Sequence, residues 1–308
     1  MIVKTNKIIE IKNLFKKGIY DLWYPYSFPV RSSSQIKDGF YFIDVTDILK
    51  RTIYSFHDGV PVVLYNNIEY HNPSIVSLYA IYLYEMRLMN SFLNQVRWLL
   101  KQLHAGALIY NISIPQYNVF STWKSAMAQG LVISTFTRAF KLTNNLKYYN
   151  AALEAAEVLC SPIEKGGCSS FDQEGLPFLE EVTTKPTHIL NGAIFGLWGL
   201  YDLELINNIF HFSIFKKKVI ERIIKNLHLY DATYWSYYDL SHLIDNRQIL
   251  SSRGYHMLHI SQLKVLYILT EEEIFNYFAE KWEKYLKNYI FRMKVFLKKF
   301  YQYVVLKY

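Results

Sequence analysis

Cysteine is scarce in this chain: Cys160 and Cys168 are the only two among 308 residues. Two cysteines cannot form the bridges of a disulfide-dense scaffold, so the fold must rest on a packed core. The single disulfide that the sequence allows would join these two residues, which lie eight positions apart.

Long hydrophobic runs and nucleotide-binding motifs are also missing. The most apolar run, residues 189–201, contains Asn191 and is too short to cross a bilayer. Residues 1–18 carry scattered lysines and no apolar centre, unlike a signal peptide, so we expect an intracellular, cytoplasmic protein without a transmembrane segment. We find no Rossmann or P-loop glycine pattern, no zinc-finger spacing and no RNP-like motif, and we therefore expect no nucleic-acid partner.

Hydrophobic residues and tyrosines are abundant. Hydrophobic residues make up 51% of the chain and charged residues 19%, a balance typical of a packed globular protein. Aromatic residues reach 17%, with 27 tyrosines, which suits ordinary packing at most positions and a carbohydrate groove at a few. The formal net charge of +8 favours a polyanionic partner: nucleic acid, an anionic membrane surface or an acidic polysaccharide.

The chain repeats one plan four times, in which a β-like segment precedes two helices. This plan predicts a mainly α fold, an α/α toroid of about four helical hairpins with short β-hairpin connections gathered at one end; an open α-solenoid is the alternative. We expect residues 1–50 to form a mixed, β-containing segment packed on a domain of residues 51–308, and residues 291–308 to form a last packing helix rather than a membrane contact. The β-like segments are 52–70, 106–118, 166–181 and 232–240, and the helix pairs are 73–89 with 91–104, 122–142 with 146–160, 187–206 with 214–229, and 255–270 with 272–290.

Three clusters on the connecting segments could carry chemistry. Glu180-Glu181 follows an apolar stretch, where desolvation would raise the pKa of one carboxyl toward that of a useful base; the alternative is an exposed acidic turn. Tyr237-Tyr238-Asp239 is either a site or an aromatic strand on the rim. The run RGYHMLH (253–259) places two histidines three residues apart, but no third ligand at metal spacing accompanies them, so we expect no metal.

Tyr255, in the third cluster, is a poor base on its own because a free tyrosine titrates near ~10. Arg253 and the histidines could stabilise its phenolate. A carboxylate on one face of a sugar ring and a phenol on the other would remove a proton from one face and return it from the opposite one.

Four stretches, in order, resemble the C-terminal domain of the D-glucuronyl C5-epimerase family. Residues 123–159 begin WKSAMAQG, against W-x-S-A-M-A-Q-G in the family. Residues 180–203 (EEVTTKPTHILNGAIFGLWGLYDL) match E-E-Y-x-x-x-P…L-N-G…G-L-Y-D, and residues 229–242 (LYDATYWSYYDLSH) match L-Y-D…Y-D-L-R-H. Residues 255–286 begin YHMLHISQL, against Y-H-x-x-H-I-x-Q-L. The resemblance covers about 120–290 and leaves residues 1–50 unexplained.

This resemblance implies an α/α barrel that inverts C5 of D-glucuronate to L-iduronate within an acidic, heparosan-like polysaccharide, without a diffusible cofactor. It implies Glu181, Tyr238 and Tyr255 as the catalytic residues. The candidates for binding substrate or orienting the tyrosines are Trp123, Asn191, Arg253 and His256. A homodimer is the oligomeric alternative to a monomer.

Two positions depart from the family pattern. The tyrosine of E-E-Y is Val182, and the arginine of Y-D-L-R is Ser241, which removes a planar cation that could bind a carboxylate. Arg253 or Arg247 could replace that cation, so we expect retained chemistry with altered recognition. Two alternatives stay open: a polysaccharide lyase, which begins with the same C5 deprotonation, and a non-catalytic glycan-binding relative.

Overall fold

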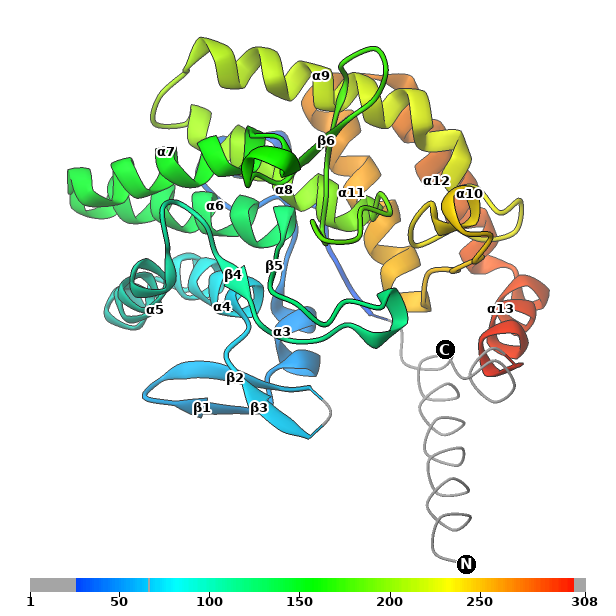
Figure 1. The fold of residues 1–308 in the computed structure, drawn as a ribbon, viewed down its shortest axis with the longest axis horizontal. Helices are drawn as coiled ribbons and strands as arrows, with labels where there is room; N and C mark the ends of the chain where they lie inside the picture. Colours follow the sequence, from blue (N-terminus) through cyan, green and yellow to red (C-terminus); the bar gives the residue numbers. More distant parts are fainter. Residues whose placement is uncertain (1–25, 66, 302–308) are drawn as a thin grey trace, which may run out of the picture. The chain divides into compact units, whose positions relative to one another are not determined.

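The computed structural model describes residues 26–65 and 67–301, and the chain divides into two compact units. One unit comprises Val30–Leu227, called here the central unit; the other, the terminal unit, comprises Met1–Pro29 with His228–Tyr308. Both are mainly helical over their described residues, which confirms the predicted class (Figure 1). The predicted boundary at residue 50 is a different division and stays a prediction.

Three helical hairpins form the central unit, and each lies within a few residues of its predicted range. They are α4 (Pro73–Glu85) with α5 (Met89–Gln102), α6 (Ala126–Thr143) with α7 (Leu146–Cys160), and α8 (Leu190–Glu204) with α9 (Phe210–Asn226). Side-chain caps begin several of them: Asn72 caps α4, Ser125 caps α6 and Asn145 caps α7. The hydrophobic period therefore located the helices, and the capping residues fix where they begin.

Short antiparallel strands precede each hairpin. β1 (Ser55–His57), β2 (Val60–Tyr65) and β3 (Ile68–Tyr70) form one sheet beside α4, and the predicted Asp58-Gly59 turn joins β1 to β2. β6 (Ser169–Phe171) pairs with β7 (Pro177–Leu179) inside the predicted segment 166–181.

The second connection differs from the prediction. β4 (Ile109–Tyr110) pairs not within 106–118 but with β5 (Trp123–Lys124), which lies in the range predicted as the start of a helix. The helix begins at Ala126 because Ser125 has extended backbone and its hydroxyl accepts the N–H of Ala128. A capping serine therefore outweighs the helical pattern that precedes it.

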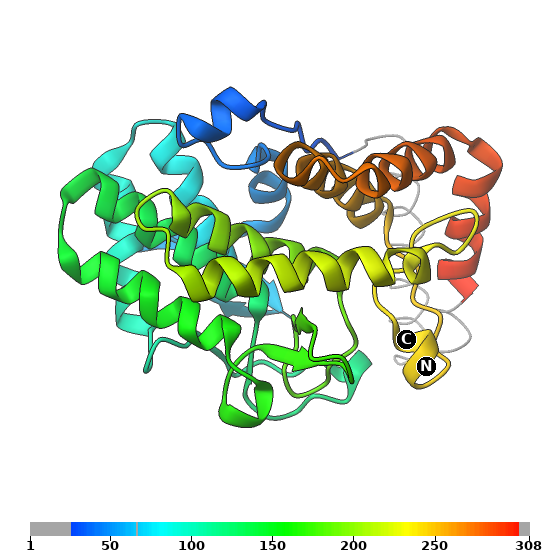
Figure 2. The same cartoon turned by 90° about the horizontal axis from the view of Figure 1, so that it is seen from above.

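Close approach of α6 to α8 defines the core of the central unit, as Figures 1 and 2 show. Glycines make it possible: a Cβ on Gly130 would lie 2.3 Å from the carbonyl oxygen of Phe195, and one on Gly199 would lie 2.5 Å from that of Gly130. A buried ion pair also joins the two helices, with Arg138 Nη1 donating to Asp202 Oδ2 over 2.7 Å. The two helix backbones are consequently in van der Waals contact.

Residues 26–50 are the described part of the predicted mixed segment. They contain the short helix α2 (Ser33–Lys37), the start of α3 (Thr46–Thr52), and one isolated β-bridge between Val30 and Ile43, and the segment 1–50 as a whole stays a prediction. Ser32 and Gln35 form a capping box that starts α2. This local signal for a helix start is not visible from the aromatic composition of the segment. Residues 1–25 lie outside the described residues.

The terminal unit contains the fourth hairpin, α11 (Arg253–Thr270) with α12 (Glu273–Lys287), preceded by η3 (Leu227–Tyr230) and α10 (Ser241–Ile244). Residues 232–240, all of them described, do not form the expected strand. They make isolated β-bridges instead, such as the one between Tyr237 and Leu250. The side chain of Trp235 instead packs into a small core with Leu250 and Val295.

The predicted last helix is present over its described residues as α13 (Tyr289–Tyr301); residues 302–308 of the prediction lie outside the described residues. Val295 is its buried residue, and the ammonium group of Lys294 lies 3.8 Å from the ring centre of Tyr234, so the helix packs on the terminal unit. No helix among the described residues is long and apolar enough to span a membrane.

We expect Gly130→Ala to lower the free energy of unfolding by about 3 kcal/mol, because the new methyl group would overlap the backbone of α8. Gly175→Ala is the matched control. Its Cβ would meet nothing within 4 Å, and only its φ of +75° opposes the change, at about 1 kcal/mol. Urea unfolding of both variants measures the difference. A loss at Gly130 no larger than the control's would contradict the proposed close contact.

Candidate active site

Glu181 lies where the segment after β7 meets the first turns of α6 and α8. Its Oε2 accepts the backbone N–H of Met127, the second residue of α6, over 3.2 Å, and Ser125 also hydrogen-bonds to its carboxylate. A Cβ on Gly192, in the first turn of α8, would lie 2.5 Å from the same oxygen. Two helix N-termini therefore face one carboxyl group, and Gly192 leaves it the necessary space.

The electrostatics of this position make Glu181 an unusual acid. Burial raises the pKa of its carboxyl to about 8, and the hydrogen bonds from Ser125 and Met127 offset only part of that rise. The residue nevertheless keeps some accessible surface. A carboxyl group that exchanges its proton near neutral pH and can be reached is suited to general acid–base catalysis. The sequence predicts one such desolvated carboxyl in Glu180-Glu181.

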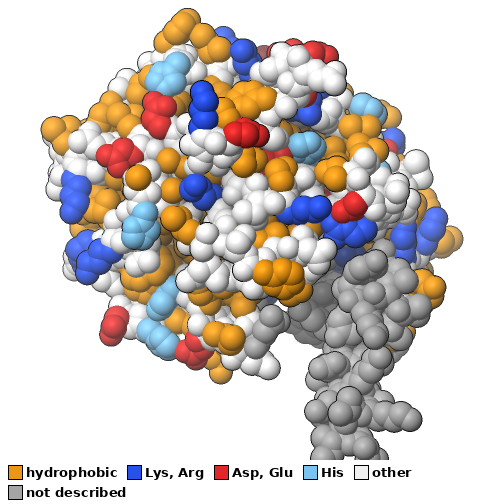
Figure 3. Space-filling model, in the orientation of Figure 1, with side chains coloured by type: hydrophobic (Ala, Val, Ile, Leu, Met, Phe, Trp, Pro, Cys, Tyr) orange, Lys and Arg blue, Asp and Glu red, His pale blue; other side chains and the backbone are white. Residues whose placement is uncertain are grey.

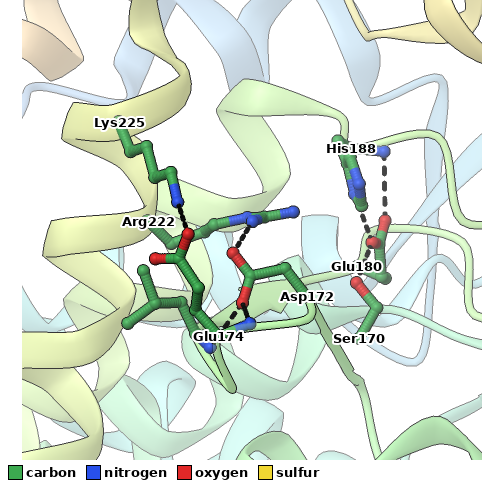
Figure 4. Close-up of polar contacts among 8 residues, drawn as sticks. Ser170, Asp172, Glu174, Glu180, His188, Arg222 and Lys225 are labelled. Carbon is green, nitrogen blue, oxygen red and sulfur yellow. Dashed lines mark hydrogen bonds and ion pairs between the residues drawn. The ribbon is translucent and has the colours of Figure 1, made fainter.

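The adjacent Glu180 is a structural anchor (Figure 4). Its side chain is fully buried, and it binds the Ser170 hydroxyl over 2.5 Å, His188 Nδ1 over 2.5 Å and the His188 backbone N–H over 3.1 Å. Its backbone oxygen accepts the N–H of Ala126 at the start of α6. Glu180 thereby fixes the direction in which the next side chain, Glu181, points.

Ion pairs hold the β6–β7 loop against α9. Figure 4 shows Arg222 pairing with Asp172 and Lys225 pairing with Glu174. Asp172 Oδ1 also accepts the backbone N–H groups of Glu174 and Leu176. The loop that leads into Glu180 and Glu181 is therefore tied down at its tip as well as at its base.

Trp123 and Asn191 both lie in the core of the central unit. Trp123 is 6% exposed; its indole N–H donates to the Ile112 carbonyl, and its ring stacks on Tyr110 with centroids 4.3 Å apart. Little of the ring is left to stack on a sugar, so its visible role is to support Tyr110. Asn191 is 3% exposed and precedes Gly192 in the first turn of α8, close in sequence to the Glu181 contact.

Tyr238 and Tyr255 meet in the terminal unit. Their ring centroids are 4.8 Å apart at an interplanar angle of 61°. Tyr255 lies in the first turn of α11, its N–H bonded to the capping Ser252, and it is 42% exposed. The backbone N–H of Tyr238 donates to the Ile249 carbonyl. The two predicted phenols thus form one aromatic pair that solvent can reach.

His256 supports that pair from within the core. It is fully buried and stacked on Trp235, with centroids 3.8 Å apart. Its Nδ1 accepts from the backbone N–H of Ser236 and its Nε2 bonds to the Trp282 carbonyl, which requires the neutral Nε2–H tautomer. Burial lowers the pKa of His256 to about 3, so the ring is uncharged at neutral pH.

This position favours one of the two roles expected for His256. The ring bonds to Ser236, in the segment that carries Tyr238, and to Trp282 in α12, and it directly follows Tyr255 in α11. A neutral, buried ring is a poor ligand for a carboxylate, so a role in orienting the tyrosines stays a prediction. Arg253 is the first residue of α11, two positions from Tyr255. Arg247, the other candidate cation, pairs with Asp245 over 2.7 Å.

The two departures from the family pattern are both buried. Val182 is 3% exposed, and Ser241 is fully buried, with its backbone N–H donating to Asp239 Oδ1 over 3.0 Å. Neither position offers a polar group to a substrate in the place of the family residue.

Sequence reasoning missed a polar network in the central unit. Asn72 bonds to the hydroxyls of both Tyr65 and Tyr110, over 2.7 and 3.0 Å, and Ser74 bonds to Tyr110 over 2.7 Å. Its one visible signal in the sequence is Asn72-Pro73, which marks a helix start and does not indicate contacts with the tyrosines.

Glu181 belongs to the central unit and the Tyr238–Tyr255 pair to the terminal unit, so their predicted pairing stays a prediction.

Comparison with known proteins identifies the family. The family described as D-glucuronyl C5-epimerase C-terminus matches residues 102–284, more than half of the chain. The chain belongs to this family. Its Glu181, Tyr238 and Tyr255 all lie within the matched residues.

Two relatives illustrate how much of the chain is shared with known proteins. A D-glucuronyl C5-epimerase of Caenorhabditis elegans is 31% identical over 176 residues, 53% of this chain and 29% of the relative. An uncharacterised protein of Methanocaldococcus jannaschii is 29% identical over 180 residues, 57% of this chain and 56% of the relative. The chain thus spans less than two thirds of either relative's length.

Two further observations concern the charge on the surface and the possibility of a metal site. Figure 3 shows lysine and arginine interspersed with acidic and apolar side chains over the drawn face. Among residues 26–65 and 67–301, no group of three or more histidine, cysteine, aspartate or glutamate side chains is placed to hold a metal ion.

The raised pKa of Glu181 predicts a pH-dependent stability. The Glu181 carboxyl has a pKa of about 8 in the folded protein and an ordinary pKa of about 4.3 in the unfolded chain. Between these two pH values the folded state binds this proton more strongly than the unfolded state does. Stability from this group is therefore complete below about pH 4.3 and is lost as pH rises through about 8, by at most about 1.4 kcal/mol per pH unit.

Glu181→Gln removes this titration and should gain stability relative to the wild type between pH 5 and 8, a range set by those pKa values. Glu164→Gln, at an exposed position, is the matched control and should follow the wild-type curve. Urea unfolding at a series of pH values measures both. Parallel curves for wild type and Glu181→Gln would show that the carboxyl titrates normally.

Proposed function

We propose that this chain is a hexuronate C5-epimerase, of the D-glucuronate to L-iduronate type, that acts on residues within an acidic polysaccharide. The observation that carries the proposal is the Glu181 carboxyl, whose pKa is raised to about 8 at the meeting point of two helix N-termini in a member of this family. Such a group can take a proton from carbon and can also return one near neutral pH.

The reaction needs only proton transfer. The Glu181 carboxylate takes the C5 proton and becomes a carboxylic acid, while the C5–H electron pair moves into the substrate carboxylate to give an enediolate. A tyrosine hydroxyl, assigned to Tyr255 with Tyr238 in support, donates a proton to C5 from the opposite face. The phenolate then regains a proton and Glu181 loses one, which restores both groups. In the reverse direction the two residues exchange roles.

This pairing requires the four hairpins to close into an α/α toroid, with residues 171–181, 234–242 and 253–259 at one end. The formal net charge of +8 supports an acidic polymer as the substrate. Within the terminal unit, Arg253 is the cation nearest in sequence to Tyr255, and we assign it to the substrate carboxylate. A homodimer is not part of the proposal, since no finding supports one.

Elimination shares the first step with epimerisation and diverges when the C4 oxygen leaves. Incubation of heparosan or glucuronan in deuterated water separates the two outcomes. An epimerase places solvent deuterium at C5 and leaves the polymer chain intact. A lyase instead yields an unsaturated, ultraviolet-absorbing product and shorter chains, and that result would replace the proposal.

We expect Glu181→Gln and Tyr255→Phe each to slow C5 exchange by about a hundredfold or more, because each removes a group that transfers a proton. Mass spectrometry of the recovered disaccharides measures the deuterium. The matched controls are Glu164→Gln and Tyr267→Phe; Tyr267 lies further along α11, where its hydroxyl donates to Glu273. Both controls should retain the wild-type rate.

A non-catalytic glycan-binding relative would give a different pattern. Its polymer affinity would be measurable, but no deuterium would enter at C5, and neither Glu181→Gln nor Tyr255→Phe would alter that affinity. That set of results would reject the enzyme assignment.

A further inference from the structure

Asn72 orients a phenol in the central unit through an amide whose two ends are fixed. Its Oδ1 accepts the N–H groups of Ser74 and Ile75 at the start of α4, over 2.9 and 3.3 Å, and also bonds to the Tyr110 hydroxyl over 3.0 Å. Because these contacts require the oxygen, the amide nitrogen must face Tyr65, whose hydroxyl oxygen it approaches to 2.7 Å.

This arrangement leaves the Tyr65 proton directed elsewhere. Asn72 Nδ2 is a donor, so it occupies a lone pair of the phenol oxygen and not its hydrogen. Tyr65 ends β2 and is 38% exposed, so a molecule in solvent can reach it. Burial raises the pKa of Tyr65, and the Glu181 carboxylate raises it further, so the phenol keeps its proton at neutral pH.

A continuous set of contacts within the central unit leads from Tyr65 to Glu181. Tyr110 bonds to Asn72 and stacks on Trp123, its partner in the β4–β5 pair. Trp123 lies two residues before Ser125, which hydrogen-bonds to Glu181. The negative charge of Glu181 contributes to the raised pKa of both Tyr65 and Tyr110, after the larger effect of burial.

The same neighbourhood lacks a phenol that the family pattern contains. Val182 stands where E-E-Y has its tyrosine, and its side chain is buried and apolar. A phenol near Glu181 must therefore come from another part of the chain, and Tyr110 is only 2% exposed. Tyr65 is the exposed member of the network that reaches Glu181.

We propose that Tyr65 binds the uronate substrate, with its hydroxyl, aimed by Asn72, donating to the carboxylate as negative charge develops there during C5 deprotonation. Tyr65 thereby supplies the phenol that Val182 does not. The inference rests on the proposed C5 chemistry and adds a substrate-contacting residue from the strand segment before α4. Asn72 is a positioning residue, since it acts through Tyr65.

The direct test is Tyr65→Phe in the C5-exchange assay with heparosan. Loss of a hydrogen bond to a developing charge should lower kcat by about tenfold to a hundredfold. The Kd for heparosan, measured by calorimetry, should change by at most about threefold, because the charge on the carboxylate grows only after binding. The melting midpoint should fall by only a few degrees, since the ring is retained and a single hydrogen bond from Asn72 is lost.

Tyr54→Phe is the matched control, because Tyr54 is 61% exposed and immediately precedes β1 of the same sheet. It should keep the wild-type kcat. Wild-type kcat in Tyr65→Phe, or a loss that matches a loss of folded protein, would overturn the inference while leaving the proposed function intact. Absence of exchange in the wild type itself would overturn both.

Asn72→Asp tests the aiming of the phenol. Aspartate caps a helix as well as asparagine does, so α4 should be retained. It presents a carboxylate oxygen to Tyr65 in place of an N–H donor, which turns the phenol proton toward residue 72 and away from substrate. We expect kcat to fall at least tenfold with Kd for heparosan within about threefold of wild type. A kcat within twofold of wild type would show that Asn72 does not position Tyr65.

Discussion

Close contact between α6 and α8 is the constraint on which the candidate site of the central unit depends. Gly130 and Gly199 permit the helix backbones to touch. Gly192, in the first turn of α8, likewise has no side chain to fill the space beside Glu181. The carboxyl of Glu181 occupies the space so left, beside the N–H of Met127. A larger residue at Gly192 would overlap the carboxylate itself, so packing and chemistry share one requirement.

Burial and helix polarity act in opposite directions on Glu181. Peptide dipoles at two helix N-termini favour the charged form, whereas removal from water disfavours it. Burial is the larger effect, and the pKa rises to about 8. Glu180, bonded to Ser170 and His188, anchors the backbone next to this carboxyl.

The hydrophobic period was sufficient to locate all four hairpins because each helix buries a continuous apolar face. It was not sufficient for the segments between them. The helical pattern before α6 extends over β5, and only the local cap at Ser125 ends it there. Trp235 lies in a strand-like sequence, but its side chain packs in a core with Leu250 and Val295. That contact is tertiary, between residues distant in sequence, and local pattern does not report it.

For the site, residue pattern pointed to the Glu180-Glu181 pair and to Tyr255, and the family resemblance implied Glu181 as the catalytic carboxylate; neither indicated the groups that contact them. His256 is a candidate because of its neighbour in sequence, and the structure buries it in contact with Ser236 and the Trp282 carbonyl, which favours an orienting role. The Tyr65–Asn72 pair could not be recognised, because its relation to Glu181 runs through Tyr110 on another strand.

The most direct measurement is the titration of Glu181 by carbon-13 NMR of its side-chain carboxyl, with Glu181→Gln assigning the resonance. The account predicts a midpoint near pH 8, set by desolvation between the first turns of α6 and α8. A midpoint near 4.3, the ordinary value for glutamate, would show a solvated carboxylate and would contradict its assignment as the base.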